Sequence, residues 1–413
     1  MKNSKYYPWL VVALLWIVAL LNYMDRQMLA TMRPSMESDI PELVSGENFG
    51  RLMAVFLWIY ALMSPVSGII ADKLNRKWLI IGSLFVWSAV TYAMGFAKTY
   101  NEIYWLRAIM GVSEALYIPA GLSLIADYHQ QKTRSLAIGI HMTGLYVGSA
   151  LGGFGATIAA TYSWHSTFHH FGIVGVVYSV VLVFFLYEKK DKVKTFDPEF
   201  NKTNDKVPLL KGLALLFTNI SFWVILFYFA IISLPGWATK NWLPTLFSDN
   251  LGISMDQAGP LATITISFSS LLGVVFGGIL SDKWVQKNIR GRIYTSAIGL
   301  SLTIPALMLI GFGHSLYHVV GAVLCFGIGY GMFDANNMPI ICQFVSARYR
   351  ATAYGILNMT GVGCGALVTS LLGKSADAGN LGYGFSLMAG IVLIALISQI
   401  SFLRPKVNDF VDL

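Results

Sequence analysis

A few ionisable residues stand inside long apolar stretches of this sequence, where charges are rare. They are Asp25, Arg26, Arg107, Glu114, Lys240 and Asp334. A charge at the centre of an apolar span costs about 2.5–3.5 kcal/mol even on insertion scales. Such groups must face a wet cavity or pair with one another, so they mark the place where we expect chemistry.

The two residue types favour different tasks. An arginine fork binds a carboxylate through two parallel hydrogen bonds and stays charged at any working pH, so we expect Arg26 to bind an anion. Burial favours the neutral form of a carboxylic acid and a nearby arginine favours the charged form. Asp25 and Glu114 are therefore candidates for taking up a proton on one side of a membrane and releasing it on the other.

One hypothesis involves four of these residues, Asp25, Arg26, Arg107 and Glu114. Protonation of the acids frees Arg26 from internal pairing, the carboxylate of the anion replaces the lost charge, and Arg107 holds Glu114 in the unloaded state. Arg107 and Glu114 are seven residues apart, or two helical turns, so they share a face. Asp25 and Arg26 are adjacent and diverge by about 100°. The alternative is a fixed structural network of ion pairs.

Other polar residues of the apolar stretches have weaker claims on the same anion. They are Tyr23, Tyr60, His141, Asn336, Asn337, Asn358 and Lys240. Lone tyrosines and histidines are also common as packing residues, and we keep that alternative. Asn336 and Asn337 precede Pro339, and polar groups beside a proline predict a broken helix that lines a cavity.

The composition shows what must position these residues. Of 413 residues, 55% are hydrophobic and 12% charged, whereas soluble domains carry about 25% charged residues. A lipid core about 30 Å thick needs about 20 apolar residues per helix. We therefore expect an all-α membrane protein with helices near 9–31, 49–70, 78–97, 103–126, 136–160, 169–187, 220–247, 258–281, 292–312, 318–343, 351–373 and 382–403.

The polar segment 188–211 divides these helices into two sets of six. We expect an N-terminal bundle at 1–187, a cytoplasmic linker at 188–211 and a C-terminal bundle at 212–413. The net charge of +8 falls in short clusters in every second loop and at both ends. This is the positive-inside pattern, so it predicts cytoplasmic termini and argues against nucleic acid as a partner. The outward loops are short and carry no glycosylation sequon, which favours a bacterial cytoplasmic membrane.

The two halves repeat each other. The loop that starts Gly68-Ile-Ile-Ala-Asp72-Lys73 reappears 210 residues later as Gly278-Ile-Leu-Ser-Asp282-Lys283. The segment starting at Arg134 reappears 216 residues later at Arg350. Parallel repeats of six spans are typical of one class of secondary transporters, whose substrate site lies between the halves at mid-membrane.

The loop from Gly68 to Lys77 resembles that of the major facilitator superfamily, except that Asn75 replaces a glycine. The resemblance implies a charge latch at the cytoplasmic side that holds one conformation closed. Its members are Asp72, Arg76, Asp282 and Arg292. The alternative is that these are solvated loop charges.

A narrower resemblance is to the anion:cation symporter family of sugar-acid, sialic-acid and glutamate carriers. It rests on Asn22-Tyr23-Met24-Asp25-Arg26, Tyr60, Arg107 with Glu114, and Trp242-Leu243-Pro244. The Asp-Arg and Arg/Glu pairs are also similar to those of spinster-like lipid carriers.

The resemblance implies a proton-coupled symporter for a small organic anion such as a hexuronate, aldonate or sialic acid, with sodium as the alternative ion. Ser64 and Pro65 depart from the family pattern. A spinster-like lipid transporter and a transporter-shaped sensor remain alternatives. No phosphate-binding loop is present, so nothing indicates pumping driven by ATP. No nucleophile–base signature is present either, so we expect a protein that is not an enzyme and has no cofactor. We also expect a monomer, since nothing in the sequence demands a partner. His165, His169 and His170 are interpreted as outer-loop residues and not as a metal site.

Overall fold

The computed structural model describes residues 5–129, 131–188, 216–218, 220–345 and 350–405. Within these ranges, twelve helical spans are long and apolar enough to cross a membrane, which confirms the predicted all-α class. Lipid offers no hydrogen-bond partners, so the backbone of each span must satisfy its N–H and C=O groups within its own helix.

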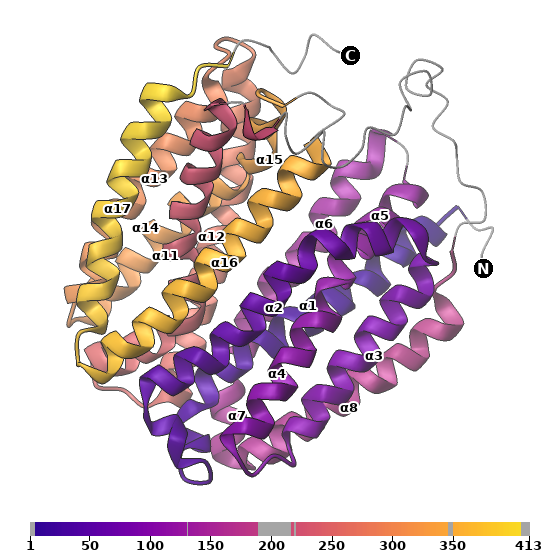
Figure 1. Cartoon of the computed structure of the whole chain (residues 1–413), viewed down its shortest axis with the longest axis vertical. Helices are drawn as coiled ribbons and strands as arrows, with labels where there is room; N and C mark the ends of the chain where they lie inside the picture. Colours follow the sequence, from indigo (N-terminus) through magenta and orange to yellow (C-terminus); the bar gives the residue numbers. More distant parts are fainter. Residues whose placement is uncertain (1–4, 130, 189–215, 219, 346–349, 406–413) are drawn as a thin grey trace.

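The first half of the chain forms one group of helices, drawn in indigo to magenta in Figure 1. Its elements are α1 (Tyr7–Met36), η1 (Pro41–Val44), α2 (Gly46–Lys73), α3 (Arg76–Met94), α4 (Tyr100–Ala115), α5 (Tyr117–Tyr128), α6 (Gln131–Gly152), α7 (Gly155–Thr161) and α8 (Trp164–Phe185). We call this group the N-terminal bundle.

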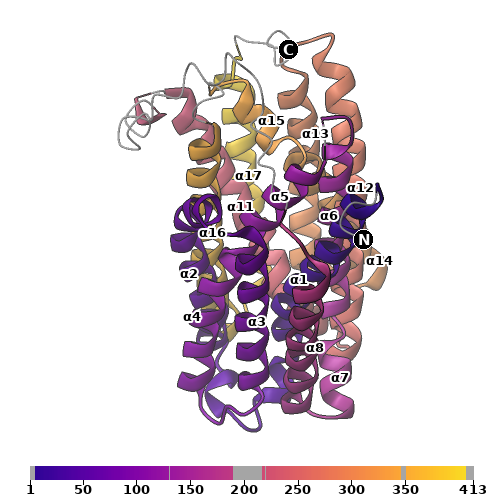
Figure 2. The same ribbon diagram turned by 90° about the vertical axis from the view of Figure 1, so that its right-hand side faces the viewer.

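The second half forms the C-terminal bundle, which lies beside the first (Figure 1). Its elements are α11 (Ile220–Leu251), α12 (Met255–Val285), α13 (Gly291–Phe312), α14 (Leu316–Asp334), α15 (Asn337–Cys342), α16 (Arg350–Asp377) and α17 (Leu381–Phe402). The axes of the long helices of both bundles are roughly parallel to one another (Figure 2). The proposed linker 188–211 lies outside the described residues except for Glu188, so its boundaries remain a prediction.

Three spans consist of two helical segments each. The break in the tenth span falls at residues 335–336, between α14 and α15, as the polar run before Pro339 predicted. Breaks at Leu116, between α4 and α5, and at residues 153–154, between α6 and α7, were not anticipated. Glu114 and Asp334 lie at two of these breaks, so both carboxylates stand where the regular backbone ladder is interrupted.

The sixth span begins earlier than predicted. Ser163 accepts a hydrogen bond from the Ser166 backbone N–H at 3.1 Å, a side-chain cap that starts the helix at Trp164. His165, His169 and His170 therefore lie in α8, and their assignment to a loop was wrong. The cause is the composition of this first turn, which is polar although it is helical.

Glycines let helices approach closely at two important places. A Cβ added at Gly148 of α6 would lie 2.2 Å from the Leu20 carbonyl oxygen of α1, and one at Gly46 of α2 would lie 2.7 Å from the Gly373 carbonyl oxygen of α16. No other residue fits such contacts. The first packs α6 closely against α1, and the second joins the two bundles.

The two ends of the molecule differ in charge. At the end where α1 begins and α17 ends lie Lys73, Arg76, Lys77, Lys283, Lys287 and Arg290; we call it the basic end. The opposite end is where α1 ends and α17 begins. At the basic end Asn75 accepts a hydrogen bond from the Trp78 backbone N–H at 3.2 Å and caps α3, which gives the departure from the superfamily motif a structural role.

Candidate functional site

A buried ion pair joins α1 and α4 in the N-terminal bundle. The Arg26 Nε lies 2.5 Å from the Glu114 Oε2, and the two side chains are 10% and 0% exposed. The expected divergence of Asp25 from Arg26 is also present. Asp25 points toward α3, where it accepts a hydrogen bond from the Thr91 hydroxyl at 3.4 Å. The adjacent charges therefore serve different neighbours.

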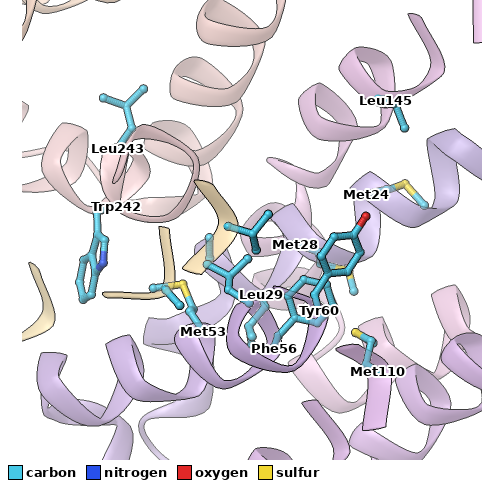
Figure 3. Close-up of a cluster of buried hydrophobic side chains, with 14 of the residues drawn as sticks. Met24, Met28, Leu29, Met53, Phe56, Tyr60, Met110, Leu145, Trp242 and Leu243 are labelled. Carbon is cyan, nitrogen blue, oxygen red and sulfur yellow. The ribbon is translucent and has the colours of Figure 1, made fainter. Parts of the chain in front are cut away.

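Aromatic rings surround the Arg26 guanidinium. Its carbon lies 4.9 Å from the centres of the Tyr23 and Phe56 rings and 4.6 Å from that of Tyr60. Figure 3 shows Phe56 and Tyr60 together on α2, with Met28 beside them. Ring faces attract a cation, most strongly where water is excluded. The two tyrosines predicted as hydroxyl ligands thus form walls around Arg26 in this conformation.

Several polar atoms at this ion pair are buried without a hydrogen-bond partner. They are the Arg26 Nη2, the Glu114 Oε1 and both amide atoms of Asn22. A buried polar group without a partner costs about 1–3 kcal/mol. The site therefore retains unused binding capacity on the cation and beside it.

Arg107 does not hold Glu114 in this conformation. Its guanidinium carbon lies 4.6 Å from the Phe56 ring centre, and its Nη1 donates to the Met110 Sδ at 3.2 Å. No ion pair of Arg107 is present within the described part of the chain. Arg107 and Glu114 do lie on the same side of α4, as expected. Glu114 is paired with Arg26 because that guanidinium reaches it from α1.

A cavity of about 110 Å³ lies between the bundles, and Tyr23, whose ring contacts the Arg26 guanidinium, forms part of its wall. The N-terminal bundle contributes Tyr23 and the α6 residues around Tyr146, while α11, α12 and α14 contribute the rest. Its polar lining consists of Tyr23, Tyr146, Ser149, Thr239, Lys240, Ser267, Ser270, Tyr330 and Asp334. Such a mixture of hydroxyls and charges can bind a small polar molecule.

Lys240 and Asp334 are the two charged residues of this lining. The Lys240 Nζ lies 4.7 Å from the Trp237 ring centre and 5.7 Å from that of Tyr23. Asp334 accepts a hydrogen bond from the Asn337 Nδ2 at 3.1 Å, and Tyr146 lines the same cavity. Among the described residues, neither charge forms an ion pair.

The remaining predicted ligands lie farther from the cavity. His141 is fully buried and packs edge-on against Tyr117 at 6.0 Å. Asn336 is buried and donates to the Met332 carbonyl at 2.8 Å. Asn358 donates to the Ser64 hydroxyl at 3.0 Å and so connects α16 to α2. Their roles as ligands stay predictions, and the geometry gives each a packing or capping contact.

Hydrogen bonds close the seam between the bundles at the opposite end. The Asp377 carboxylate, at the end of α16, accepts from the Ser45 hydroxyl at 3.0 Å and from the Gly46 and Glu47 backbone N–H groups at 2.5 and 2.9 Å. It thus caps the N-terminus of α2 in the other bundle. Lys374 adds an ion pair with Glu47 at 3.5 Å.

Two ion pairs of the predicted latch residues each lie within a single bundle. Arg76 pairs with Asp127 in the N-terminal bundle, and Arg292 pairs with Asp282 at 3.7 Å in the C-terminal bundle. The Asp72 side chain lies outside the described atoms. The latch therefore stays a prediction for another conformation.

Sequence reasoning missed several contributors to the site. Tyr146, Tyr330 and the hydroxyls of α12 line the cavity, and Asp377 seals the seam. The α12 hydroxyls had a signal in the sequence, a run of five Ser and Thr residues between positions 263 and 270 inside an apolar span. Isolated tyrosines have no such signal.

Comparisons with known proteins agree on one family. The model of the Major Facilitator Superfamily matches residues 15–369. A hexuronate transporter of Bacillus subtilis is 23% identical over 96% of this chain and 95% of its own length. A probable galactarate/D-glucarate transporter of Escherichia coli is 23% identical over 99% of this chain and 91% of its own length.

The fold is similar to that of a solved bacterial homologue of the human lysosomal transporter Spinster, in an inward-facing and unoccupied conformation. The TM-score is 0.80 at 19% identity, over 97% of this chain and 98% of that one, a likeness that shows the fold alone. The twelve spans and the match over most of the chain lead to one conclusion. This chain is a multi-pass membrane protein that belongs to the major facilitator superfamily.

Proposed function

We propose that the protein is a secondary active transporter that couples movement of a small sugar acid to protons by alternating access. The observation that carries this proposal is the buried Arg26–Glu114 ion pair beside a polar cavity between the bundles. The names of the relatives, which include hexuronate and galactarate transporters, support the substrate class.

Coupling follows from exchange of one negative charge for another. In the unloaded state Glu114 neutralises Arg26 through its Nε, while the Nη2 has no partner. When Glu114 takes up a proton it no longer balances the guanidinium. The substrate carboxylate then binds the fork of Arg26 and restores the charge balance. Loading therefore requires both the proton and the anion.

Asp25 and Arg107 have supporting roles in the proposal. Asp25 is 4% exposed and has one hydroxyl partner, Thr91, so it is the second proton-binding carboxyl of the proposal. Arg107 shares the Phe56 ring with Arg26. It is placed to attract Glu114 when that acid gives up its proton.

Alternating access requires the seam at the opposite end to open. Opening breaks the Asp377 cap on α2 and the Lys374–Glu47 ion pair. The basic end then closes, and Asp72, Arg76, Asp282 and Arg292 form the latch there. The positive-inside pattern favours a cytoplasmic location of the basic end, and the present conformation is then sealed toward the outside.

The cavity lining argues against a lipid as substrate. Lys240, Asp334 and the surrounding hydroxyls border the space between the bundles, and an acyl chain there would leave these polar groups without partners at a cost of about 1–3 kcal/mol each. A sugar acid supplies both a carboxylate and several hydroxyls to them. The lipid reading is therefore the less favoured outcome.

The test is uptake of labelled galactonate, glucuronate, galactarate and sialic acid into proteoliposomes with an imposed inward proton gradient. We expect accumulation of at least one of them that a protonophore abolishes and that does not depend on sodium. Accumulation driven by sodium alone would replace the proton in the proposal. No gradient-dependent uptake of any of these acids would overturn it and favour lipid transport or sensing.

A further inference from the structure

The C-terminal bundle carries a second cation and carboxylate at places equivalent to Arg26 and Glu114. Lys240 follows Arg26 by 214 residues, and Asp334 follows Glu114 by 220. These offsets lie within about one helical turn of those between the repeated loops, 210 and 216. Each bundle therefore has a cation on its first span and a carboxylate on its fourth.

The two carboxylates also share a local setting. Glu114 is the penultimate residue of α4, just before the break that precedes α5, and Asp334 is the last residue of α14, just before the break that precedes α15. Helix breaks at membrane depth are tolerated where they line a cavity or are buried in protein. The equivalence is thus one of position on the chain and of place in the fold.

The two pairs differ in state. Arg26 and Glu114 are in contact, whereas Lys240 and Asp334 form no ion pair among the described residues and both line the cavity. Asp334 is exposed, and it accepts a hydrogen bond from the Asn337 side chain. A space is left between a donor, the Lys240 ammonium, and an acceptor, the Asp334 carboxylate.

The chemistry of a group that fits this space is restricted. It must accept a hydrogen bond from Lys240 and donate one to Asp334. A hydroxyl does both, because it has one donor hydrogen and two acceptor lone pairs. A second carboxylate satisfies Lys240 but is repelled by the like charge of Asp334. The net charge of the two residues is zero, which matches the neutral part of a substrate.

One small molecule can reach both sites. Arg26 and Lys240 lie 4.9 and 5.7 Å from the centre of the same Tyr23 ring, so their charged groups are at most about 11 Å apart. The Gln27 Nε2 donates to the Lys240 carbonyl at 2.8 Å and fixes α1 against α11 at this level. The carboxylate site and the space at Lys240 are therefore neighbours across the interface.

We propose that Lys240 and Asp334 form a polyol subsite that selects sugar acids with one carboxylate and a hydroxylated far end. This inference rests on the proposed function, because Arg26 takes the carboxylate. The preferred substrates are aldonates and related monocarboxylates, and aldarates, which carry a carboxylate at each end, are rejected.

Galactonate and galactarate are matched probes, since they differ only in whether the far end is a hydroxymethyl group or a carboxylate. Their affinities are measured by calorimetry on the full-length protein in nanodiscs, and both are tested as competitors of labelled galactonate in proteoliposomes. We expect galactonate to bind at least about tenfold more tightly than galactarate.

Two variants move this ratio in opposite directions. Asp334→Asn removes the repelling charge and leaves Lys240 for the second carboxylate, so the preference shifts toward galactarate. Lys240→Met leaves Asp334 alone, so it shifts further toward galactonate while both affinities fall. A residue with a merely structural role would lower both affinities in proportion. If one variant does not fold, the other still tests the direction of its own shift.

Equal or tighter binding of galactarate by the unchanged protein, or a ratio that neither variant moves, would overturn the polyol subsite and leave sugar-acid transport intact. Failure of every sugar acid to bind or to be transported would instead overturn the proposed function.

Discussion

The two bundles hold equivalent charge pairs in opposite states. The N-terminal pair, Arg26 with Glu114, is closed and buried among aromatic rings, while the C-terminal pair, Lys240 with Asp334, is open toward the cavity. Arginine binds carboxylates through a planar fork and lysine is a single mobile point charge. The difference indicates a division of labour, in which the N-terminal bundle handles charge and the C-terminal bundle recognises the neutral part of the substrate.

The largest expected effect comes from replacing Arg26 of the N-terminal pair by lysine, the cation of the C-terminal pair. Arg26→Lys keeps the charge but loses the fork and its contacts with three rings, so binding and uptake of sugar acids should fall by about 100-fold or more. Binding is measured by calorimetry and transport by uptake into proteoliposomes. Arg51→Gln, which removes an exposed arginine from α2, is the control and should leave both unchanged. Near-normal binding by Arg26→Lys would show that the arginine fork is not needed to bind the substrate.

Next in size is the separation of binding from coupling. Glu114→Gln keeps the shape of the side chain but cannot exchange a proton, so accumulation against a gradient should fall at least about tenfold, while exchange of substrate across the membrane persists. Counterflow and gradient-driven uptake are compared on the same vesicles.

Glu102→Gln is the matched control for that variant, since Glu102 lies on the same helix in the capping box of its first turn. It should leave coupling unchanged. Accumulation by Glu114→Gln at the level of the unchanged protein would mean that the ion pair is a structural one.

A smaller effect is expected at the seam, which must open if the two bundles are to present their sites to both sides. Asp377→Asn weakens three hydrogen bonds to α2, each worth about 1.5–3 kcal/mol when the acceptor is charged. A cysteine placed at the buried Met53 of α2, in a background free of the native cysteines, should then be labelled several-fold faster from the opposite end. Asp256→Asn, at the same end but with a carboxylate that makes none of the seam bonds to α2 described above, is the control. Equal labelling rates would show that the cap does not govern opening.

The smallest effect separates two roles of Asn358. If its contact with Ser64 matters only for packing of the bundles, Asn358→Ala and Ser64→Ala should change substrate affinity alike, by about twofold or less. If Asn358 is a ligand, its substitution should weaken binding while that of Ser64 does not. Binding of galactonate to both variants decides between the roles.

Much of the fold could be predicted from the sequence because lipid restricts the choices. Apolar spans of the required length must be helices, and the twelve spans and the superfamily were confirmed. The helix ends were less predictable. The polar first turn of α8 concealed its start at Trp164. The break at Leu116 had an overlooked signal, because Pro119 follows it at the spacing at which Pro339 follows Asn336, and a proline has no N–H for the carbonyl four residues earlier.

The candidate site was predictable in part for a similar reason. A charge inside an apolar span is costly, so Arg26, Glu114, Lys240 and Asp334 could be identified from sequence alone. Their pairing could not, because it depends on which helix faces which across the bundle. Arg107 and Glu114 lie on one helix face, yet the shorter reach is from Arg26 of α1. Tyr146 and Asp377 face the other bundle, and the sequence of one span does not indicate which residues of the other bundle lie opposite it.

The central claim is that the carboxylate of the substrate replaces the charge of Glu114 as that acid takes up a proton. It is tested most directly by calorimetry of galactonate binding in buffers of different ionisation enthalpy, which counts the protons taken up on binding. The account predicts uptake of about one proton per galactonate by the unchanged protein and a clearly smaller uptake by Glu114→Gln. Binding without proton uptake, or the same uptake in both proteins, would contradict it.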